Sequence, residues 1–75
     1  MYTDNDLREW FLKKVDDAEK KNIILKKKFL QHSVIGKHHC YLKDAAKVLN
    51  ELIQNKILYF SEEDTSIRNY KGEIL

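Results

Sequence analysis

Residues 45–70, AAKVLNELIQNKILYFSEEDTSIRNY, join a helical pattern to an extended one, and this junction decides the fold. Apolar residues recur three and four positions apart up to Ile53, which is the spacing of one face of an α-helix. Asn55 and Lys56 close this helix, and the β-branched and aromatic run over 57–60 predicts a strand. The polar segment SEEDTS follows, and residues 66–70 are expected to pair back as the second strand of a hairpin. The expected inward face of the helix consists of Leu42, Ala45, Ala46, Val48, Leu49, Leu52 and Ile53.

A second helix is predicted at the amino-terminal end, over residues 4–21. Its apolar stripe is made of Leu7, Trp10, Phe11, Val15 and Ala18. Thr3 is a suitable N-cap, and Asp4 and Asp6 occupy the first turn, where the helix dipole favours acidic groups. We expect Trp10 and Phe11 to be the main core anchors of this helix.

The middle of the chain leaves two alternatives open. Residues 22–36 fit a short helix that uses Leu25, Phe29 and Val34, or a brief strand at 23–25 followed by a helix at 26–34. Periodicity does not separate these alternatives in short apolar runs. Gly36 is predicted to stop the helix or to lie in a turn. At the other end of the chain, Ile74 and Leu75 are expected to dock on the core.

Composition places the chain among small single domains, here residues 1–75, of mostly helical α+β class. The absence of proline and the presence of only two glycines favour helices over many strands. Cys40 has no partner cysteine, which is typical of a reducing compartment, so we expect a soluble, cytoplasmic protein. No apolar run approaches the ~20 residues that span a bilayer, and no membrane partner is expected. The net charge is +2, but residues 20–47 contain eight lysines and one aspartate, a net +7.

The order of helix, short element, helix and hairpin resembles the winged helix-turn-helix family. The stretch 45–70 carries the likeness, which extends over residues 4–70. The resemblance implies a DNA-binding transcriptional regulator whose recognition helix is residues 42–56. Members of the family usually have a glycine between this helix and the next strand; here Asn55 and Lys56 stand instead, and asparagine tolerates the left-handed conformation that the turn needs. The segment 34–41 is also longer than the usual turn of about three to four residues before the recognition helix.

Four side chains that bind metals in other proteins lie close together in the sequence: His32, His38, His39 and Cys40. Three of them are consecutive, and an ordinary backbone does not direct three consecutive side chains at one ion. Cys40 and His39 are neighbours rather than a nucleophile and base brought together by a fold. We therefore expect no metal, no cofactor and no enzymatic activity, although the sequence alone does not exclude a metal at these residues.

The exposed face of the helix 42–56 is the candidate DNA-reading surface. Lys43, Lys47, Asn50 and Gln54 fall on one outward stripe, because they are spaced by four, three and four residues. Lysine contacts phosphates and guanine, and asparagine and glutamine pair with adenine. Phosphate contacts are expected from residues that precede this helix, namely Lys26, Lys27, Lys28, Lys37 and His38.

A protein-interaction module or inhibitor, binding a protein partner through the same charged surface, is the alternative function. The predicted hairpin loop carries Glu62, Glu63 and Asp64, which would repel DNA phosphates. The lysine-, isoleucine- and asparagine-rich composition also resembles that of phage, viral or mobile-element proteins. The partner is thus duplex DNA or a protein, and a chain this small would need a homodimer or larger assembly for sequence specificity.

Overall fold

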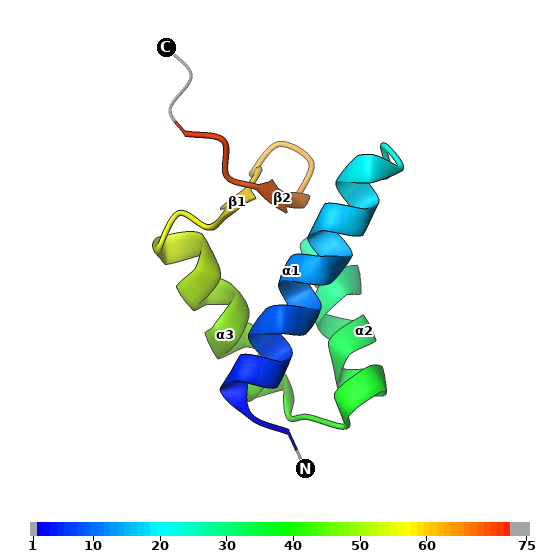
Figure 1. Ribbon diagram of the computed structural model, residues 1–75, viewed down its shortest axis with the longest axis vertical. Coiled ribbons are helices and arrows are strands. Elements are labelled where there is room, and N and C mark those ends of the chain that lie inside the picture. Colours follow the sequence, from blue (N-terminus) through cyan, green and yellow to red (C-terminus); the bar gives the residue numbers. More distant parts are fainter. Residues whose placement is uncertain (1, 73–75) are drawn as a thin grey trace.

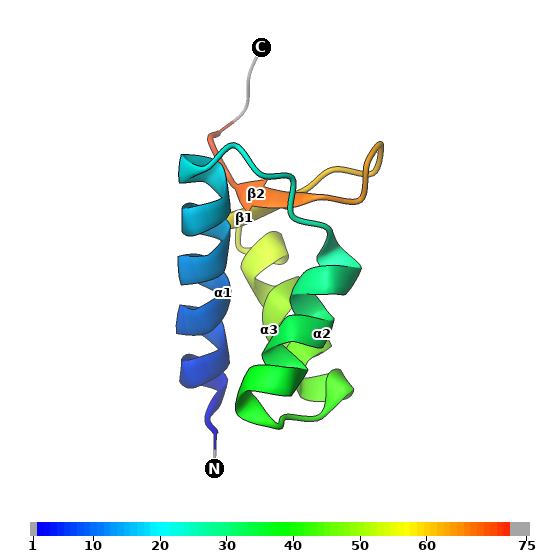
Figure 2. The same ribbon diagram turned by 90° about the vertical axis from the view of Figure 1, so that its right-hand side faces the viewer.

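Three helices are followed by a two-stranded antiparallel hairpin in the computed structural model of the chain, which describes residues 2–72. The elements are α1 (Asp4–Lys20), α2 (Lys27–His38), α3 (Leu42–Gln54), β1 (Leu58–Phe60) and β2 (Ile67–Asn69), shown in Figure 1. Each helix packs against the other two, and the hairpin lies across one end of the bundle (Figure 2). The predicted α+β class, with helices first and a hairpin last, is confirmed.

α1 begins where the sequence predicts, with a reciprocal capping box. The Thr3 hydroxyl accepts a hydrogen bond from the Asp6 amide (3.1 Å), and the Asp6 carboxylate accepts one from the Thr3 amide (2.9 Å). These bonds satisfy amides that would have no partner within the helix. Phe11 is fully buried, as expected, but Trp10 is only half-buried and packs at the edge of the core.

The observed α2 differs at both ends from the helix predicted over residues 26–34. The segment 23–25 is not a strand; a single antiparallel bridge joins Lys26 to Ser66, and the Ile67 amide donates to the Leu25 carbonyl (2.8 Å). The helix then runs through Gly36 to His38, so the predicted stop at Gly36 is wrong. His39, at φ 53°, supplies the left-handed residue that ends the helix.

The inward face of α2 was also assigned in part to the wrong residue. Val34 is buried, as expected, but Leu30 rather than Phe29 fills the adjoining core position. Phe29 is 64% exposed. A helix places consecutive residues about 100° apart, so burying Leu30 turns its neighbour outward.

The hairpin closes the core at the end where α3 finishes. Leu58 pairs with Asn69 and Phe60 with Ile67, and the side chains of Leu58 and Ile67 are buried. Both predicted strands are confirmed, and each is shorter than predicted. β2 is also tied to α1, because the Asn69 amide donates to the Glu19 carboxylate (2.8 Å). The predicted docking of Ile74 and Leu75 lies outside the described residues.

A single core forms between the helices and beneath the hairpin. Its buried apolar members are Leu7, Phe11, Val15, Leu30, Val34, Cys40, Ala45, Val48, Leu49, Leu52, Leu58 and Ile67. Leu42 is 54% exposed, so its assignment to the inward face of α3 is wrong, whereas Ala46 and Ile53 are partly buried. Among residues 2–72, every helix falls short of the length and apolar character needed to traverse a bilayer.

The turn between α3 and β1 is strained at Lys56 and not at Asn55. Lys56 has φ 60°, in the left-handed region, whereas Asn55 has an ordinary negative φ of −82°. A side chain other than glycine in the left-handed region costs about 1 kcal/mol or more, and glycine avoids that cost while losing more backbone entropy on folding. We therefore expect Lys56→Gly to raise the free energy of unfolding by about 0.5–1 kcal/mol, as measured by urea denaturation.

Asn55→Gly is the matched control for this change. It adds backbone entropy to the unfolded chain without relieving strain, so we expect it to lower stability by about 0.5–1 kcal/mol. Equal effects of the two glycines would show that the turn adopts a different backbone conformation in solution.

Candidate nucleic-acid interface

The four polar side chains predicted for the outer face of α3 lie together there. Lys43, Lys47, Asn50 and Gln54, here called the α3 stripe, are all exposed. The opposite face of the helix is buried against α1 and α2 and consists of Ala45, Val48, Leu49 and Leu52. The helix ends at Gln54, two residues earlier than predicted, and the whole stripe lies within it. The predicted orientation is confirmed.

The two lysines of the α3 stripe make only weak contacts within the chain. The Lys47 ammonium lies 3.4 Å from the Asp4 carboxylate, and both side chains are about half exposed. Exposed ion pairs of this kind contribute about 0–1 kcal/mol. The Lys43 ammonium lies 5.8 Å from the centroid of the Tyr41 ring, which is a cation–π distance. Neither contact holds its cation strongly enough to prevent binding to an anion.

The start of α2 meets the carboxyl-terminal half of the α3 stripe. The Lys27 ammonium donates to the Asn50 side-chain oxygen (3.3 Å) and lies 5.0 Å from the centroid of the Phe60 ring. Lys28, next along α2, is exposed. The structure thus brings Lys27 to Asn50, although they are far apart in the sequence.

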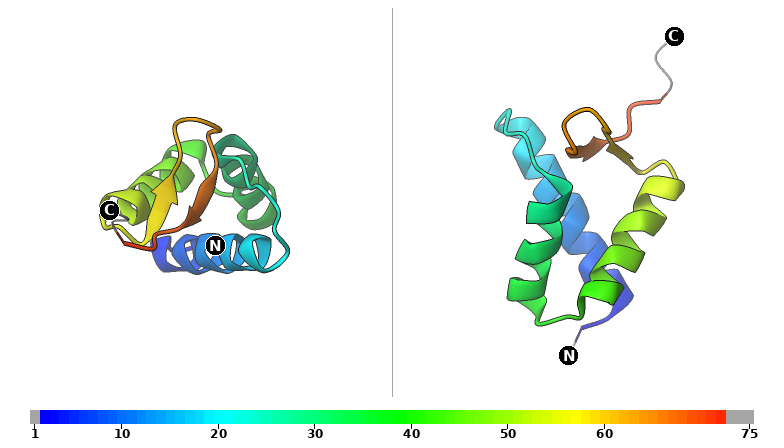
Figure 3. Two further views of the ribbon diagram at one scale, coloured as in Figure 1. Left: turned by 90° about the horizontal axis from the view of Figure 1, so that it is seen from above. Right: turned by 180° about the vertical axis from the view of Figure 1, so that it is seen from behind.

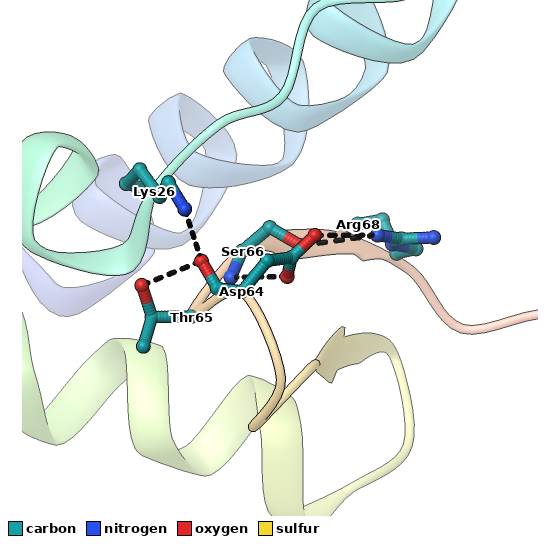
Figure 4. A network of polar contacts seen from close by, with 5 residues as sticks. All are labelled: Lys26, Asp64, Thr65, Ser66 and Arg68. Atoms are coloured by element: carbon teal, nitrogen blue, oxygen red, sulfur yellow. Dashed lines mark hydrogen bonds and ion pairs between the residues drawn. The ribbon is translucent and has the colours of Figure 1, made fainter.

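The loop of the hairpin is held by a compact polar network (Figure 4). The Asp64 carboxylate accepts hydrogen bonds from the Ser66 hydroxyl (2.6 Å) and amide (3.1 Å), and Arg68 lies 3.6 Å away. These hydrogen bonds, chiefly those from Ser66, lower the pKa of Asp64. Lys26 donates to the Asp64 carbonyl, so its ammonium is used in the loop. Glu62 and Glu63 are exposed at the tip.

Lys37 and His38 do not lead into α3 as predicted, because both belong to the last turn of α2. Lys37 lines a groove with Trp10 between α1 and α2. The His38 ring stands edge-on to Trp10, with centroids 6.4 Å apart, and its Nε2 atom is buried without a hydrogen-bond partner among the described residues. The prediction failed because α2 continues past Gly36 and carries both side chains toward α1.

The histidines and the cysteine are not gathered around one point. Within residues 2–72, no three histidine, cysteine or acidic side chains are arranged to hold a metal ion. Cys40 is buried in the core, and this burial raises the pKa of its thiol. A thiol with a raised pKa is a poor nucleophile at neutral pH.

Two exposed side chains at the amino end of α3 were missed by sequence reasoning. Tyr41 is 71% exposed and Leu42 54% exposed, and they stand beside Lys43 at the beginning of the stripe. This end is fixed by Tyr2, whose hydroxyl donates to the Asp44 carboxylate (2.5 Å) and accepts from the Tyr41 amide (3.3 Å). The bond to Asp44 raises the pKa of Tyr2. The available signal was that Leu42 is the first residue of its helix.

No family model, curated protein or solved structure matches this chain. The arrangement of three helices and a hairpin is consistent with winged-helix architecture. Architecture alone does not determine function, and the surface chemistry of this chain is the remaining indication of what it binds.

Proposed function

We propose that this chain is a small DNA-binding protein of regulatory type that contacts duplex DNA through the exposed face of α3. The observation that carries the proposal is the α3 stripe, in which two amines and two carboxamides project from one helix face opposite a buried one. A major groove is wide enough to admit an α-helix, and these are side chains that contact phosphates and base edges there.

The charge around the stripe supports contact with a polyanion. Lys27, at the start of α2, adds a cation beside Asn50 of the stripe, and Lys28, next along α2, is exposed. Each phosphate neutralised by a lysine or arginine releases condensed counterions, which makes such binding strongly salt-dependent. Lys26 contributes less in this proposal, since its ammonium bonds to the hairpin loop.

The acidic hairpin tip sets a limit on the binding mode. Glu62 and Glu63 are exposed on the loop that projects beyond the helices in Figure 2. Asp64 is engaged by Ser66 and Arg68, so two carboxylates rather than three face solvent freely. The loop is bonded to the start of α2 through Lys26 and the Lys27 amide, so in this proposal DNA lies along α3, and the two free carboxylates weaken contacts at the start of α2.

A salt-dependent titration tests the proposal. Fluorescence anisotropy of a labelled random duplex is measured at low and moderate salt for the wild type and for Lys43→Ala/Lys47→Ala. We expect weaker binding in the variant, and a salt slope smaller by about 1.8, because each lost phosphate contact removes about 0.9 from the slope.

Lys13→Ala/Lys21→Ala is the matched control, because it removes the same charge from exposed positions in α1 and at its end. It should change affinity and slope far less. If both double variants weaken binding equally, DNA is attracted by net charge and not by α3. If the wild type fails to bind duplex DNA at low salt, the proposal is wrong, and binding of a protein partner through the same charged surface becomes the better-supported function.

A further inference from the structure

An apolar groove runs between α1 and α2, on the side of the bundle away from the α3 stripe. It encloses about 470 Å³ and is lined by Trp10, Leu25, Phe29 and Leu30, with Lys14 and Lys37 among its polar members. The stripe meets α1 at Asp4 and α2 at Lys27, and neither of these residues nor any residue of α3 lines the groove. Figure 2 shows α1 and α2 side by side from the side of the groove, with α3 behind them, and Figure 3 shows from above that the three helices surround one core. A ligand in the groove and DNA on α3 would not compete for space.

The apolar surface around the groove is larger than one exposed side chain. Phe29 is 64% exposed, and Ile24, in the connection between α1 and α2, is 65% exposed. A neighbouring hollow of about 310 Å³ is lined by Ile23 and Ile24 and shares Leu25 with the groove. That hollow also has polar lining residues, among them Glu19 and Arg68, so the apolar surface is centred on the groove itself. Exposed apolar side chains grouped at a groove mark interaction sites on soluble proteins more often than isolated ones do.

The charges in the groove indicate what covers it. The described residues that line it include two lysines and no carboxylate. The Lys14 ammonium lies 5.5 Å from the centroid of the Trp10 ring, so a cation stands directly beside the apolar surface. A second copy docked across a two-fold axis would place four lysines in one interface to which the groove contributes no carboxylate, because such an interface joins identical patches. The groove is therefore complementary to an acidic partner and not to itself.

We propose that this groove binds an amphipathic helical segment of another protein, with apolar side chains seated between Trp10 and Phe29 and carboxylates paired with Lys14 and Lys37. A helix that lays its apolar face into a groove is a common mode of peptide recognition. The inference does not depend on DNA binding. If both hold, the chain joins an acidic protein segment to a DNA site.

Trp10 makes the test direct, because it is the only tryptophan in the chain and lines the groove. The probes are two synthetic helical peptides of about 18 residues, or five turns. Both have leucines on one face; one has glutamates on the other face, and its counterpart has lysines. The acidic peptide should shift Trp10 emission to shorter wavelength and saturate, because its leucines cover the half-buried ring, whereas the basic peptide should cause no shift.

Variants distinguish binding in the groove from non-specific electrostatic attraction between the peptide and the chain. Phe29→Ser removes an exposed anchor, so it should leave the fold intact. It should lower the affinity for the acidic peptide by about tenfold or more. Lys14→Glu/Lys37→Glu should reverse the preference between the two peptides. Lys13→Glu/Lys21→Glu makes the same change of charge outside the groove and should keep the wild-type preference.

Several results would overturn the inference. These are an unchanged Trp10 emission with the acidic peptide, equal binding of both peptides, or wild-type binding by Lys14→Glu/Lys37→Glu. A native-mass dimer that Phe29→Ser abolishes would also overturn it, because a second copy would then cover the groove. The duplex titration reports on α3 separately and should be unaffected by Phe29→Ser, so failure of one proposal is distinguishable from failure of the other.

Discussion

Phe11→Ala is expected to lower the free energy of unfolding by about 3–5 kcal/mol, the largest stability effect predicted for this chain. Phe11 is fully buried, stands edge-on to Trp10 with centroids 5.7 Å apart, and belongs to the core shared by the three helices. Truncation removes the transfer free energy of the ring and leaves a cavity that a tightly packed core fills only in part. At about 0.05–0.15 kcal/mol per residue, a chain of 75 residues has only about 4–11 kcal/mol to lose.

Urea denaturation followed by far-ultraviolet circular dichroism measures this effect. Phe29→Ala is the matched control, since it makes the same chemical change at a side chain that is 64% exposed. It should alter stability by less than about 0.5 kcal/mol, as surface substitutions usually do. Similar losses in the two variants would contradict the assignment of Leu30, rather than Phe29, to the core face of α2.

The second large effect concerns sequence preference. Asn50→Ala/Gln54→Ala should remove about 2–6 kcal/mol of discrimination between a selected duplex and a random one, because each bidentate pair with adenine contributes about 1–3 kcal/mol. The salt slope should not change, because neither substitution removes a charge. Lys43→Ala/Lys47→Ala should show the converse, with weaker binding across sequences and a smaller slope.

The wild type is first used to select duplexes that it binds tightly from a randomised library. Affinities for the selected and random duplexes are then compared for the wild type, for the Asn50→Ala/Gln54→Ala variant, and for Asn5→Ala. Asn5→Ala removes an exposed carboxamide from α1 and should keep the preference. A double variant that still prefers the selected duplex would show that α3 does not read bases through its carboxamides.

Both large predictions rest on elements that the sequence was able to predict. α1 and α3 carry long apolar stripes at helical spacing, and such stripes must be buried whatever their partners are. Thr3 and Asp6 supply a capping signal within the local sequence, and the capping box is present. The hairpin followed from a β-rich run, a polar loop and a return strand. The α3 stripe followed from the buried face of α3, because fixing one side of a helix fixes the other.

Most of the incorrect predictions concern α2, because the sequence of this segment carries weak signals for the buried face and the ends of a helix. Its apolar positions are few, so periodicity allowed Phe29 to face inward and Gly36 to end the helix. A glycine inside a helix costs only about 1 kcal/mol, which packing of Leu30 and Val34 outweighs. The turn before β1 shows the same limit, because Lys56, and not Asn55, takes the left-handed conformation.

The sequence by itself determined α1, α3, the hairpin, and the exposure of Lys43, Lys47, Asn50 and Gln54. Each of these depends on the pattern of residues within one continuous segment. Only the tertiary structure decided how α2 is rotated. That rotation directs Lys37 and His38 toward Trp10, leaves Phe29 exposed and forms the groove. The physical reason is that the sequence of a short, weakly amphipathic helix does not by itself fix which face is buried. The elements that pack against the helix decide this, and they are distant in the sequence.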